Sequence, residues 1–306
     1  PKAGYASIIS LRERYGTQMS EILLQAKQIS KHFGGVTALD KVDLTIKKGE
    51  IHCLMGENGC GKSTLIKIIS GFYRPDGGSI TFEGKEYDRL SIAESIGLGI
   101  QVIYQDMSIF PNLTVAENIA INNELYNHRK LVNWKSVKSI AKEALDHIGI
   151  ELPLQAVVGE LSVADKQLIA IARAILNNSK LIIMDEPTSA LTRKEVDKLF
   201  KVIRQLQKEG ISTLFVSHKL DEVFEIADQF TVFRNGKLVV ADSAKNINDE
   251  QFVYYMTGRK LEEAAFTPEK IDHDRAILKV ENLGLTNGFE KISFEIHPGE
   301  ILGITG

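Results

Sequence analysis

The segment that most limits what this chain can fold into is GENGCGKS, residues 56–63, which follows the strand-like run HCLM and overlaps the helix-like run STLIKIIS. Its spacing matches G-x-x-x-x-G-K-[ST]. Glycines at these positions let the backbone come close to a phosphate group. Successive N–H groups can then surround the phosphate while the helix N-terminus adds the positive end of its dipole. The segment therefore predicts a phosphate-binding loop between a strand and a helix.

Three side chains of this loop have predicted contacts with ATP and Mg²⁺. We expect Lys62 to neutralise the β- and γ-phosphates, Ser63 to supply a hydroxyl to Mg²⁺ and Thr64 to touch the α-phosphate. A glycine-rich turn that only caps a helix is the alternative. Cys60 is interpreted as a small tolerated residue, and alkylation of its thiol should block nucleotide binding. The predicted nucleotide-binding residues of the loop are Gly56, Glu57, Asn58, Gly59, Cys60, Gly61, Lys62, Ser63 and Thr64.

Short apolar runs alternate with amphipathic helical segments from residue 21 to about residue 258, a pattern typical of an α/β domain around a largely parallel sheet. A helix-rich insertion, about 106–178, separates the second and third strands. The expected strands are HCLM (52–55), QVIYQ (101–105), LIIMD (181–185), TLFVS (213–217) and QFTVF (229–233). The expected helices follow Gly61, Asn133, Leu161, Thr192 and Lys219, with a capping box in TRKE at 192–195.

Two acidic side chains follow the apolar strand LIIM. After a phosphate-binding loop, Asp185 can hold Mg²⁺ through its water shell, and Glu186 can reach a water in line with the γ-phosphate. An ordinary transition from strand to loop would explain the same residues without chemistry. We expect Asp185 to serve the metal and Glu186 to act as the catalytic base.

Two more polar residues follow strands that should belong to the same sheet. Gln105 comes after QVIY and His218 after TLFVS. In an open α/β sheet, ligands bind at the carboxyl ends of the strands, so both should point to the same crevice as Asp185. Singly, His218 could cap the helix after it and Gln105 could be a surface amide. Together with the loop, His218 is predicted to sense the γ-phosphate and Gln105 to contact the water or the metal.

Composition restricts the class of protein further. The chain has 37 basic and 40 acidic side chains, so it lacks the basic excess of a general nucleic-acid binder, and we expect no nucleic-acid partner. Its two cysteines, Cys53 and Cys60, form a poor disulfide framework and fit a reducing compartment. No run approaches the roughly 18 consecutive apolar residues of a membrane-spanning helix.

The flanking segments suggest an organisation in several parts. Residues 1–18 lack the features of a signal peptide and are interpreted as a leader or artificial extension before the first domain, 19–258. Residues 259–277 are rich in charged side chains and are expected to form a linker. DKVDLTIKKGEIHCLMG, from residue 40, then aligns without a gap with EKISFEIHPGEILGITG, 250 residues further on. Residues 278–306 are therefore predicted to be the truncated start of a second, similar domain.

The ordered motifs GENGCGKST, Gln105, LSVAD, LIIMDE, SALT and His218 resemble those of the nucleotide-binding subunits of ATP-binding-cassette (ABC) transporters. The resemblance covers residues 21–258. It implies an α/β fold of the P-loop NTPase class, of ABC type, with a RecA-like core, an antiparallel β subdomain and a helical subdomain.

The resemblance also assigns roles that spacing alone does not provide. Phe33 matches the aromatic residue that stacks on adenine, although a half-buried hairpin aromatic is the simpler interpretation. LSVAD, residues 161–165, matches the signature that binds the γ-phosphate across a dimer interface, with Ser162 as the contact. It departs from the usual L-S-G-G-Q, and Asp165 at the helix start should repel an incoming phosphate. Residues 189–192 match the loop that links the two sites.

The departures in LSVAD and the internal repeat resemble the amino-terminal half of tandem-cassette importers of ribose, galactose or xylose in bacteria. The resemblance implies an ATPase at the cytoplasmic face of the membrane that energises sugar import. Its implied partners are transmembrane permease subunits, which the segment after Gln105 contacts in relatives, and a second cassette or a homodimer. A periplasmic or extracellular solute-binding protein would take part indirectly.

Other classes of cassette protein share these nucleotide motifs. A soluble tandem-cassette translation factor would carry a long charged helix pair between its domains, whereas the charged stretch here has only about 17 residues, 259–275. A DNA-repair ATPase would need a long coiled coil between the phosphate loop and the signature, and the roughly one hundred residues between these motifs show no coiled-coil pattern. A nucleoside importer remains an alternative, because the cassette does not touch the transported molecule.

Overall fold

The computed structural model describes residues 21–104, 109–126, 132–259, 275–285 and 288–304, and within 122–126 only the backbone. The predicted leader, 1–18, therefore lies outside the described residues, as does most of the predicted linker. The chain divides into two units, 1–260 and 261–306, and each is considered by itself. None of the helices in the described ranges is long and apolar enough to cross a membrane.

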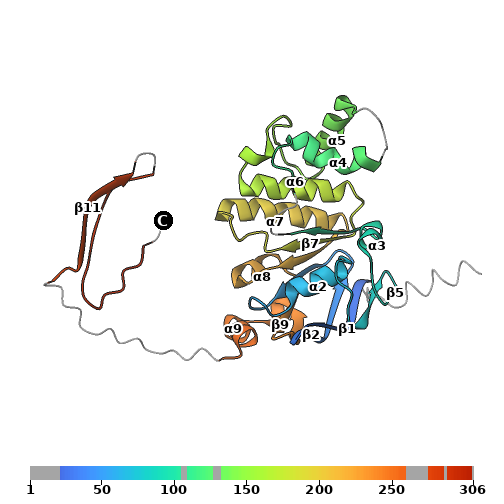
Figure 1. The fold of residues 1–306 in the computed structure, drawn as a ribbon, viewed down its shortest axis with the longest axis horizontal. Helices are drawn as coiled ribbons and strands as arrows, with labels where there is room; N and C mark the ends of the chain where they lie inside the picture. The colour runs from blue at the N-terminus through green and yellow to red at the C-terminus, as the bar shows by residue number, and fades with distance from the viewer. Residues whose placement is uncertain (1–20, 105–108, 127–131, 260–274, 286–287, 305–306) are drawn as a thin grey trace, which may run out of the picture. The chain divides into compact units, whose positions relative to one another are not determined.

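A six-stranded sheet forms the centre of the first unit, in the order β10-β9-β3-β8-β7-β6 (Figure 1). All neighbouring strands are parallel except β10, which runs antiparallel to β9. The largely parallel sheet predicted from the apolar runs is thus confirmed, with strand ends within two residues of those expected. Its strands are β3 (Ile51–Met55), β6 (Ile100–Ile103), β7 (Leu181–Asp185), β8 (Ser212–Val216), β9 (Gln229–Arg234) and β10 (Lys237–Ser243).

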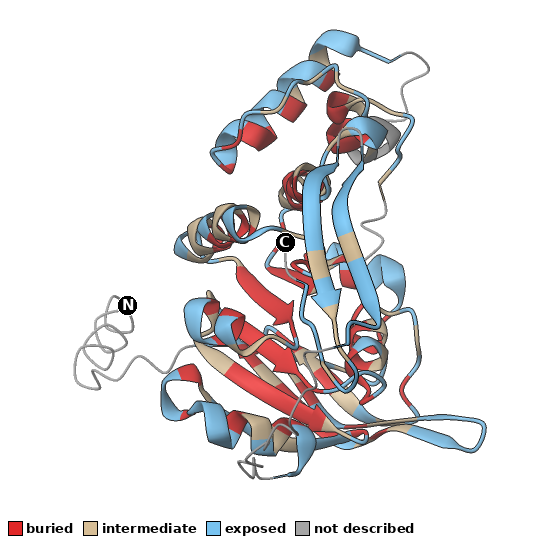
Figure 2. Ribbon diagram, turned by 90° about the vertical axis from the view of Figure 1, so that its left-hand side faces the viewer, coloured by how far each residue is buried: buried red, intermediate tan, exposed pale blue. Residues whose placement is uncertain are grey.

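Both faces of this sheet are buried, because successive side chains of a strand point to opposite faces. In β7, Ile182 and Met184 belong to one hydrophobic core, whereas Leu181 and Ile183 belong to another. Figure 2 shows the central strands of this sheet coloured as buried. This explains why the strands read as continuous apolar runs.

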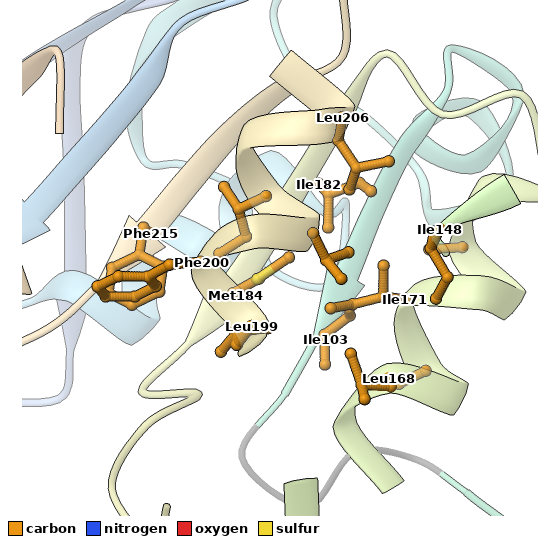
Figure 3. Close-up of a cluster of buried hydrophobic side chains, with 14 of the residues drawn as sticks. Ile103, Ile148, Leu168, Ile171, Ile182, Met184, Leu199, Phe200, Leu206 and Phe215 are labelled. Carbon is orange, nitrogen blue, oxygen red and sulfur yellow. The ribbon is translucent and has the colours of Figure 1, made fainter. Parts of the chain in front are cut away.

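Helices α6 and α7 cover the face that Ile182 and Met184 line. Figure 3 shows Leu168 of α6 and Leu199 and Leu206 of α7 gathered around these strand residues. The helices of the first unit are α2 (Lys62–Ile69), α3 (Ile92–Gly97), α4 (Val115–Tyr126), α5 (Trp134–His147), α6 (Val163–Ile175), α7 (Arg193–Lys208), α8 (Leu220–Ile226) and α9 (Asp249–Thr257), with short 3-10 turns η1 (Val158–Glu160) and η2 (Ala244–Asn246).

The opposite face packs against α2 and a second, antiparallel sheet in the order β2-β1-β4-β5. Leu24 and Ile46 of this sheet share one core with Leu65 of α2. The expected antiparallel subdomain is confirmed. Its strands are β1 (Ile22–Phe33), β2 (Val36–Lys47), β4 (Gly77–Phe82) and β5 (Lys85–Tyr87).

Local sequence signals set where the helices begin. The side chain of Asn133 accepts the N–H groups of Lys135 and Ser136 at the start of α5, and Thr192 and Glu195 form the predicted capping box of α7. The helix expected after Leu161 begins at Val163, because Ser162 is its N-cap. Helices α4 to α6 lie between β6 and β7 in the chain, and Figure 1 shows α4 and α5 beyond α6 as seen from the sheet.

The second unit contains an antiparallel hairpin, β11 (Leu278–Leu285) with β12 (Phe289–Ile296). Its pairing repeats that of β1 and β2, including a residue at positive φ in each strand. The matching pairs are Leu24↔Ile46 with Leu278↔Ile296, Ala26↔Leu44 with Val280↔Phe294, and Ile29↔Val42 with Leu283↔Ile292. The offset of 250 therefore relates β12 to β2 in register as well as in sequence, while the assignment of 278–306 to a second cassette stays a prediction.

Candidate functional site

Three of the polar motifs follow the carboxyl ends of neighbouring parallel strands. The phosphate loop follows β3, His218 follows β8, and Asp185 ends β7. In the strand pairing, Val216 is opposite both Leu54 and Asp185, so these strand ends lie at one edge of the sheet. This is the edge at which an open α/β sheet binds ligands.

The phosphate loop needs glycine at Gly56 and Gly61. A Cβ atom on Gly56 would lie 2.3 Å from the carbonyl oxygen of Phe233, and one on Gly61 would lie 2.5 Å from that of Ala38. Both glycines also have positive φ, 145° and 107°, which other residues rarely adopt. The loop is thus folded tightly against β9 and β2, and Gly61 is the N-cap of α2.

The ammonium group of Lys62 lies inside this loop. Its Nζ donates hydrogen bonds to the carbonyl oxygens of Gly56, at 2.6 Å, and Glu57, at 3.0 Å, and the residue is only 6% exposed. The outer part of the loop, Glu57, Asn58 and Gly59, is exposed, as is Ser63, while Thr64 is half-buried. A buried cation beside an exposed loop segment, residues 57–59, suits the binding of a phosphate chain.

Cys60, within the same loop, is 5% exposed, and its sulfur lies 4.0 Å from Nζ of Lys62. Burial raises the pKa of the Cys60 thiol, although the nearby ammonium group acts in the opposite direction. The thiol is therefore mostly protonated at neutral pH. The interpretation of Cys60 as a small packing residue fits this position.

Asp185 and Ser63 meet at the mouth of the loop. Burial raises the pKa of Asp185 and the neighbouring Glu186 raises it further, while Lys62 and a hydrogen bond with Ser63 lower it. A half-buried carboxylate next to another carboxylate gains from a nearby cation. A carboxylate and a hydroxyl are oxygen ligands of the kind that Mg²⁺ prefers, so these two residues fit the ion.

Glu186 lies beside His218. Its Oε1 is 3.6 Å from Nδ1 of the imidazole. Glu186 has a φ of 50°, unusual for a residue with a side chain, and its N–H donates to the carbonyl of Val216 at 3.2 Å. The alternative that His218 caps a helix is wrong, because α8 begins at Leu220 with Lys219 as its N-cap.

Gln105 lies outside the described residues, so its predicted contacts with water or metal stay a prediction. Strand β6, which precedes it, ends at Ile103.

Phe33 is 41% exposed and contacts Tyr73 edge to face, with ring centroids 5.2 Å apart. Tyr73 follows α2, the helix that starts in the phosphate loop, so the aromatic pair and the loop belong to one packed group. Asp76 holds the end of β1 next to Phe33, because it accepts hydrogen bonds from Nζ of Lys31 at 2.8 Å and from the N–H of His32 at 2.7 Å. The sequence did not single out Tyr73 or Asp76.

Ser162 is the N-cap of α6, a helix that Figure 1 shows on the other side of β7 from α2. Its hydroxyl donates to Oδ2 of Asp165 at 3.0 Å and accepts the N–H of the same residue at 3.1 Å. Lys198 of α7 lies 3.8 Å from Asp165 and partly offsets its charge. Ser162 and Asp165 thus contact each other, and Asp165 also contacts α7.

Sequence reasoning also missed Gln167 and Lys219, whose side chains contact the turn after Glu186. Gln167 is buried on the face of α6 that also carries the apolar residues Ala164, Ala170 and Ile171. A polar residue on the apolar face of a predicted helix is the signal that could have identified it.

The sequence model of the ABC transporter family matches residues 39–189, a range that contains the phosphate loop, LSVAD, Asp185 and Glu186. This chain contains an ABC transporter ATPase domain.

The cassette resembles curated import proteins over most of its length. It is 43% identical to the galactose/methyl galactoside import ATP-binding protein of Photobacterium profundum, over 94% of this chain and 58% of that protein. It is 41% identical to the ribose import ATP-binding protein of Caldanaerobacter subterraneus, again over 94% of this chain and 58% of that protein. The chain therefore spans little more than half the length of these relatives.

Solved cassettes have the same fold. The ADP conformation of MJ1267, an ATP-binding cassette of an ABC transporter, matches with a TM-score of 0.68 at 28% identity, over 76% of this chain and 98% of that one. A dimeric post-hydrolysis state of the cassette MJ0796, bound to ADP and phosphate, matches with a TM-score of 0.63 at 25% identity, over 74% of this chain and all of that one. These matches confirm the predicted P-loop NTPase fold of ABC type.

Proposed function

We propose that this cassette binds ATP with Mg²⁺ and hydrolyses it to energise the import of a monosaccharide through partner permease subunits. The observation that carries the proposal is the convergence of the phosphate loop, Asp185, Glu186 and His218 at one edge of the sheet. Such a site combines a cradle for phosphates, a metal ligand and a base.

In this proposal, the loop residues 56–64 hold the phosphates and Phe33 stacks on the adenine. Lys62 exchanges its two carbonyl partners for β- and γ-phosphate oxygens, which bind an ammonium group more strongly because they are charged. Thr64 lies near the α-phosphate. The edge-to-face contact with Tyr73 restrains the ring of Phe33, and the ring stays partly exposed, so that a base can stack on it.

Ser63 and Asp185 would hold Mg²⁺, with Gln105 as the further predicted contact. The ion would neutralise charge on the β- and γ-phosphates. Ser63 would turn its hydroxyl from Asp185 to the ion, and the raised pKa of Asp185 would fall as a positive charge replaced the hydrogen bond. The hydrogen bond between Ser63 and Asp185 supports this exchange.

Glu186 is the proposed general base, and His218 the sensor of the γ-phosphate. The carboxylate of Glu186 would accept a proton from water as that water attacks. His218, 3.6 Å away and half exposed, can restrain this carboxylate and also reach outward to the phosphate.

The names of the relatives support sugar import as the transport function, and their greater length supports a second cassette beyond this chain. Ser162 would then contact a γ-phosphate bound to the opposite cassette of a closed dimer. Because ATP would favour the closed pair over the open one, its hydrolysis would drive the permease between two states. A solute-binding protein would deliver the sugar, and the cassette would lie at the cytoplasmic face of the membrane.

One surface suits contact with a permease. Phe72, Ile92 and Ile96 are 59%, 51% and 39% exposed and line a pocket of about 240 Å³ together with Ser70 and Tyr104. Apolar side chains gathered at a pocket are typical of interaction sites. Tyr104 directly precedes Gln105, so a permease segment bound here would adjoin the predicted nucleotide site.

Two experiments test the proposal. The purified chain should bind ATP more tightly with Mg²⁺ than without it, and its hydrolysis of ATP should require Mg²⁺; the absence of ATP binding in the presence of Mg²⁺ would refute the nucleotide site. The full-length protein should then be assembled with its permease in vesicles and supplied with ribose, galactose, xylose and nucleosides. The proposal is supported if the vesicles take up a sugar and if this uptake stops when Glu186 is replaced by glutamine. Uptake of nucleosides alone would identify a nucleoside importer.

A further inference from the structure

The backbone turn that follows Glu186 is held by two side chains from different elements. Gln167 of α6 donates from Nε2 to the carbonyl oxygen of Pro187 at 3.1 Å. Lys219, the N-cap of α8, donates from Nζ to the carbonyl oxygen of Thr188 at 3.0 Å. Two consecutive peptide groups next to Glu186 are thus tied to two separate helices.

Stability alone does not explain Gln167. The residue is 3% exposed, and its Oε1 has no hydrogen-bond partner among the described residues. A buried amide with one end unpaired costs more free energy than an apolar side chain of similar volume. The other buried residues on its side of α6, such as Leu168 and Ile171, are apolar. The side-chain hydrogen bond of Gln167 to the turn is what distinguishes it from these residues.

Lys219 is fixed by a network of its own. Its Nζ lies 3.2 Å from Oε1 of Glu222, a carboxylate buried at the start of α8. Oε2 of Glu222 accepts the hydroxyl of Ser217 at 2.5 Å, and the same hydroxyl oxygen accepts the N–H of Lys219 at 3.0 Å. The ammonium group therefore has a fixed position from which to hold Thr188.

The turn needs such support because of the conformation of Glu186. A residue with a side chain and a φ of 50° persists only where the surrounding structure holds it there. The hydrogen bond from its N–H to Val216 fixes one side of the residue, and the bonds to Pro187 and Thr188 fix the other. Together these hydrogen bonds restrain the backbone on both sides of Glu186, whose side chain lies beside His218.

We propose that Gln167 and Lys219 are positioning residues that hold the turn after Glu186 and so aim its carboxylate at the attacking water. The inference rests on the proposed role of Glu186 as the base. It also connects two parts of the cassette, because Ser162 is the N-cap of α6. A displacement of α6 would move the carbonyl of Pro187, and with it Glu186.

The test compares single-turnover ATP hydrolysis by the 306-residue chain and its variants. Gln167→Met keeps the volume but removes the donor, and Lys219→Met removes the other donor from a side chain that is 41% exposed. Each should lower the hydrolysis rate by about 10- to 100-fold, the effect of a misplaced catalytic group, and change ATP affinity by less than about threefold. Lys219→Arg, which can still donate, should restore most of the rate.

A matched control and a second background make the result decisive. Thr213→Val removes a buried hydroxyl that also lacks a partner in the described structure but lies away from the turn, so its rate should not change. In a Glu186→Gln background, Gln167→Met should lower the rate further by less than about twofold, because it acts through Glu186.

Equal losses from Gln167→Met in both backgrounds, or an equal loss from Thr213→Val, would overturn the inference while leaving the base role intact. Near-normal hydrolysis by Glu186→Gln alone would instead remove the base role itself, and the inference with it. If Gln167→Met does not fold, the same comparison is made with the Lys219 variants, in the unchanged protein and in the Glu186→Gln background.

Discussion

Oε1 of Glu186 lies 3.6 Å from Nδ1 of His218, although the two residues follow different strands. The parallel pairing of β7 with β8 brings them together, since Asp185 is opposite Val216 in the register. This contact is close enough for His218 to restrain the carboxylate and too long for a firm hydrogen bond. The imidazole of His218 thus limits where the carboxylate of Glu186 can lie.

Replacing Glu186 by glutamine should leave ATP binding nearly unchanged and slow hydrolysis by roughly 10² to 10⁴, the contribution of a general base. The amide keeps the shape of the carboxylate but cannot accept the proton. Phosphate release measured beside ATP affinity checks this. Glu151→Gln, at an exposed position in another part of the domain, is the control and should hydrolyse ATP normally.

Lys62→Ala should weaken ATP binding by about 1.5 to 3 kcal/mol, or roughly 10- to 150-fold, the loss of one charge-assisted contact. The empty protein should also melt at a lower temperature, because the carbonyls of Gly56 and Glu57 lose their donor. Titration with a fluorescent ATP analogue and thermal unfolding measure the two effects. Lys180→Ala removes only an exposed ion pair with Glu83, so unchanged ATP affinity is expected for it.

Asp185→Asn should stabilise the empty protein and abolish the extra stability that Mg²⁺ gives to ATP binding. Burial raises the pKa of Asp185, so the folded protein binds the proton more readily than the unfolded chain. The cost of its charge is absent below the unfolded pKa of about 3.8 and fully present above the raised folded pKa. The advantage of the variant should therefore grow as the pH rises through this window. Denaturation between pH 4 and pH 8 measures the free energy of unfolding of the variant and of the unchanged protein. If the explanation is wrong, the difference between the two will stay constant or decrease as the pH rises.

Alkylation of Cys60 by N-ethylmaleimide should be slow at neutral pH and should accelerate about tenfold per pH unit, in proportion to the thiolate fraction. Burial raises the pKa of this thiol above its usual value, so the acceleration should continue past pH 9. Peptide mass spectrometry can follow it, with fully buried Cys53 as an internal reference. Bound ATP should protect Cys60, and normal ATP binding by the alkylated protein would contradict its place in the loop.

Asp165→Asn should strengthen ATP-dependent pairing of cassettes. The carboxylate of Asp165 lies at the start of α6 and accepts the hydroxyl of Ser162, the proposed phosphate contact. Removing this charge should favour the closed dimer by about 0.3 to 1 kcal/mol, the range for a charge at a helix terminus. Sedimentation of the chain with ATP, in a Glu186→Gln background, measures the dimer. Asp197→Asn, on the exposed face of α7, should leave the dimer unchanged.

Several features could be predicted from the sequence because they depend on neighbouring residues. Gly56 and Gly61 indicate backbone conformations that need glycine, and Thr192 with Glu195 indicates a helix start through hydrogen bonds within one turn. The contacts of Gln167 with Pro187 and of Lys219 with Thr188 could not be predicted. They join residues 20 and 31 positions apart, and no local pattern encodes them.

The sequence by itself determined the phosphate loop, the apolar strands and most helix starts, because each depends on chemistry within a few residues. Only the tertiary structure decided that β3, β8 and β7 lie side by side in that order, since strand pairing joins segments far apart in the chain. That order brings Glu186 next to His218 and Asp185 to Ser63. The tertiary packing of α6 against the core, which no local signal sets, likewise decides where its N-cap Ser162 lies in the cassette.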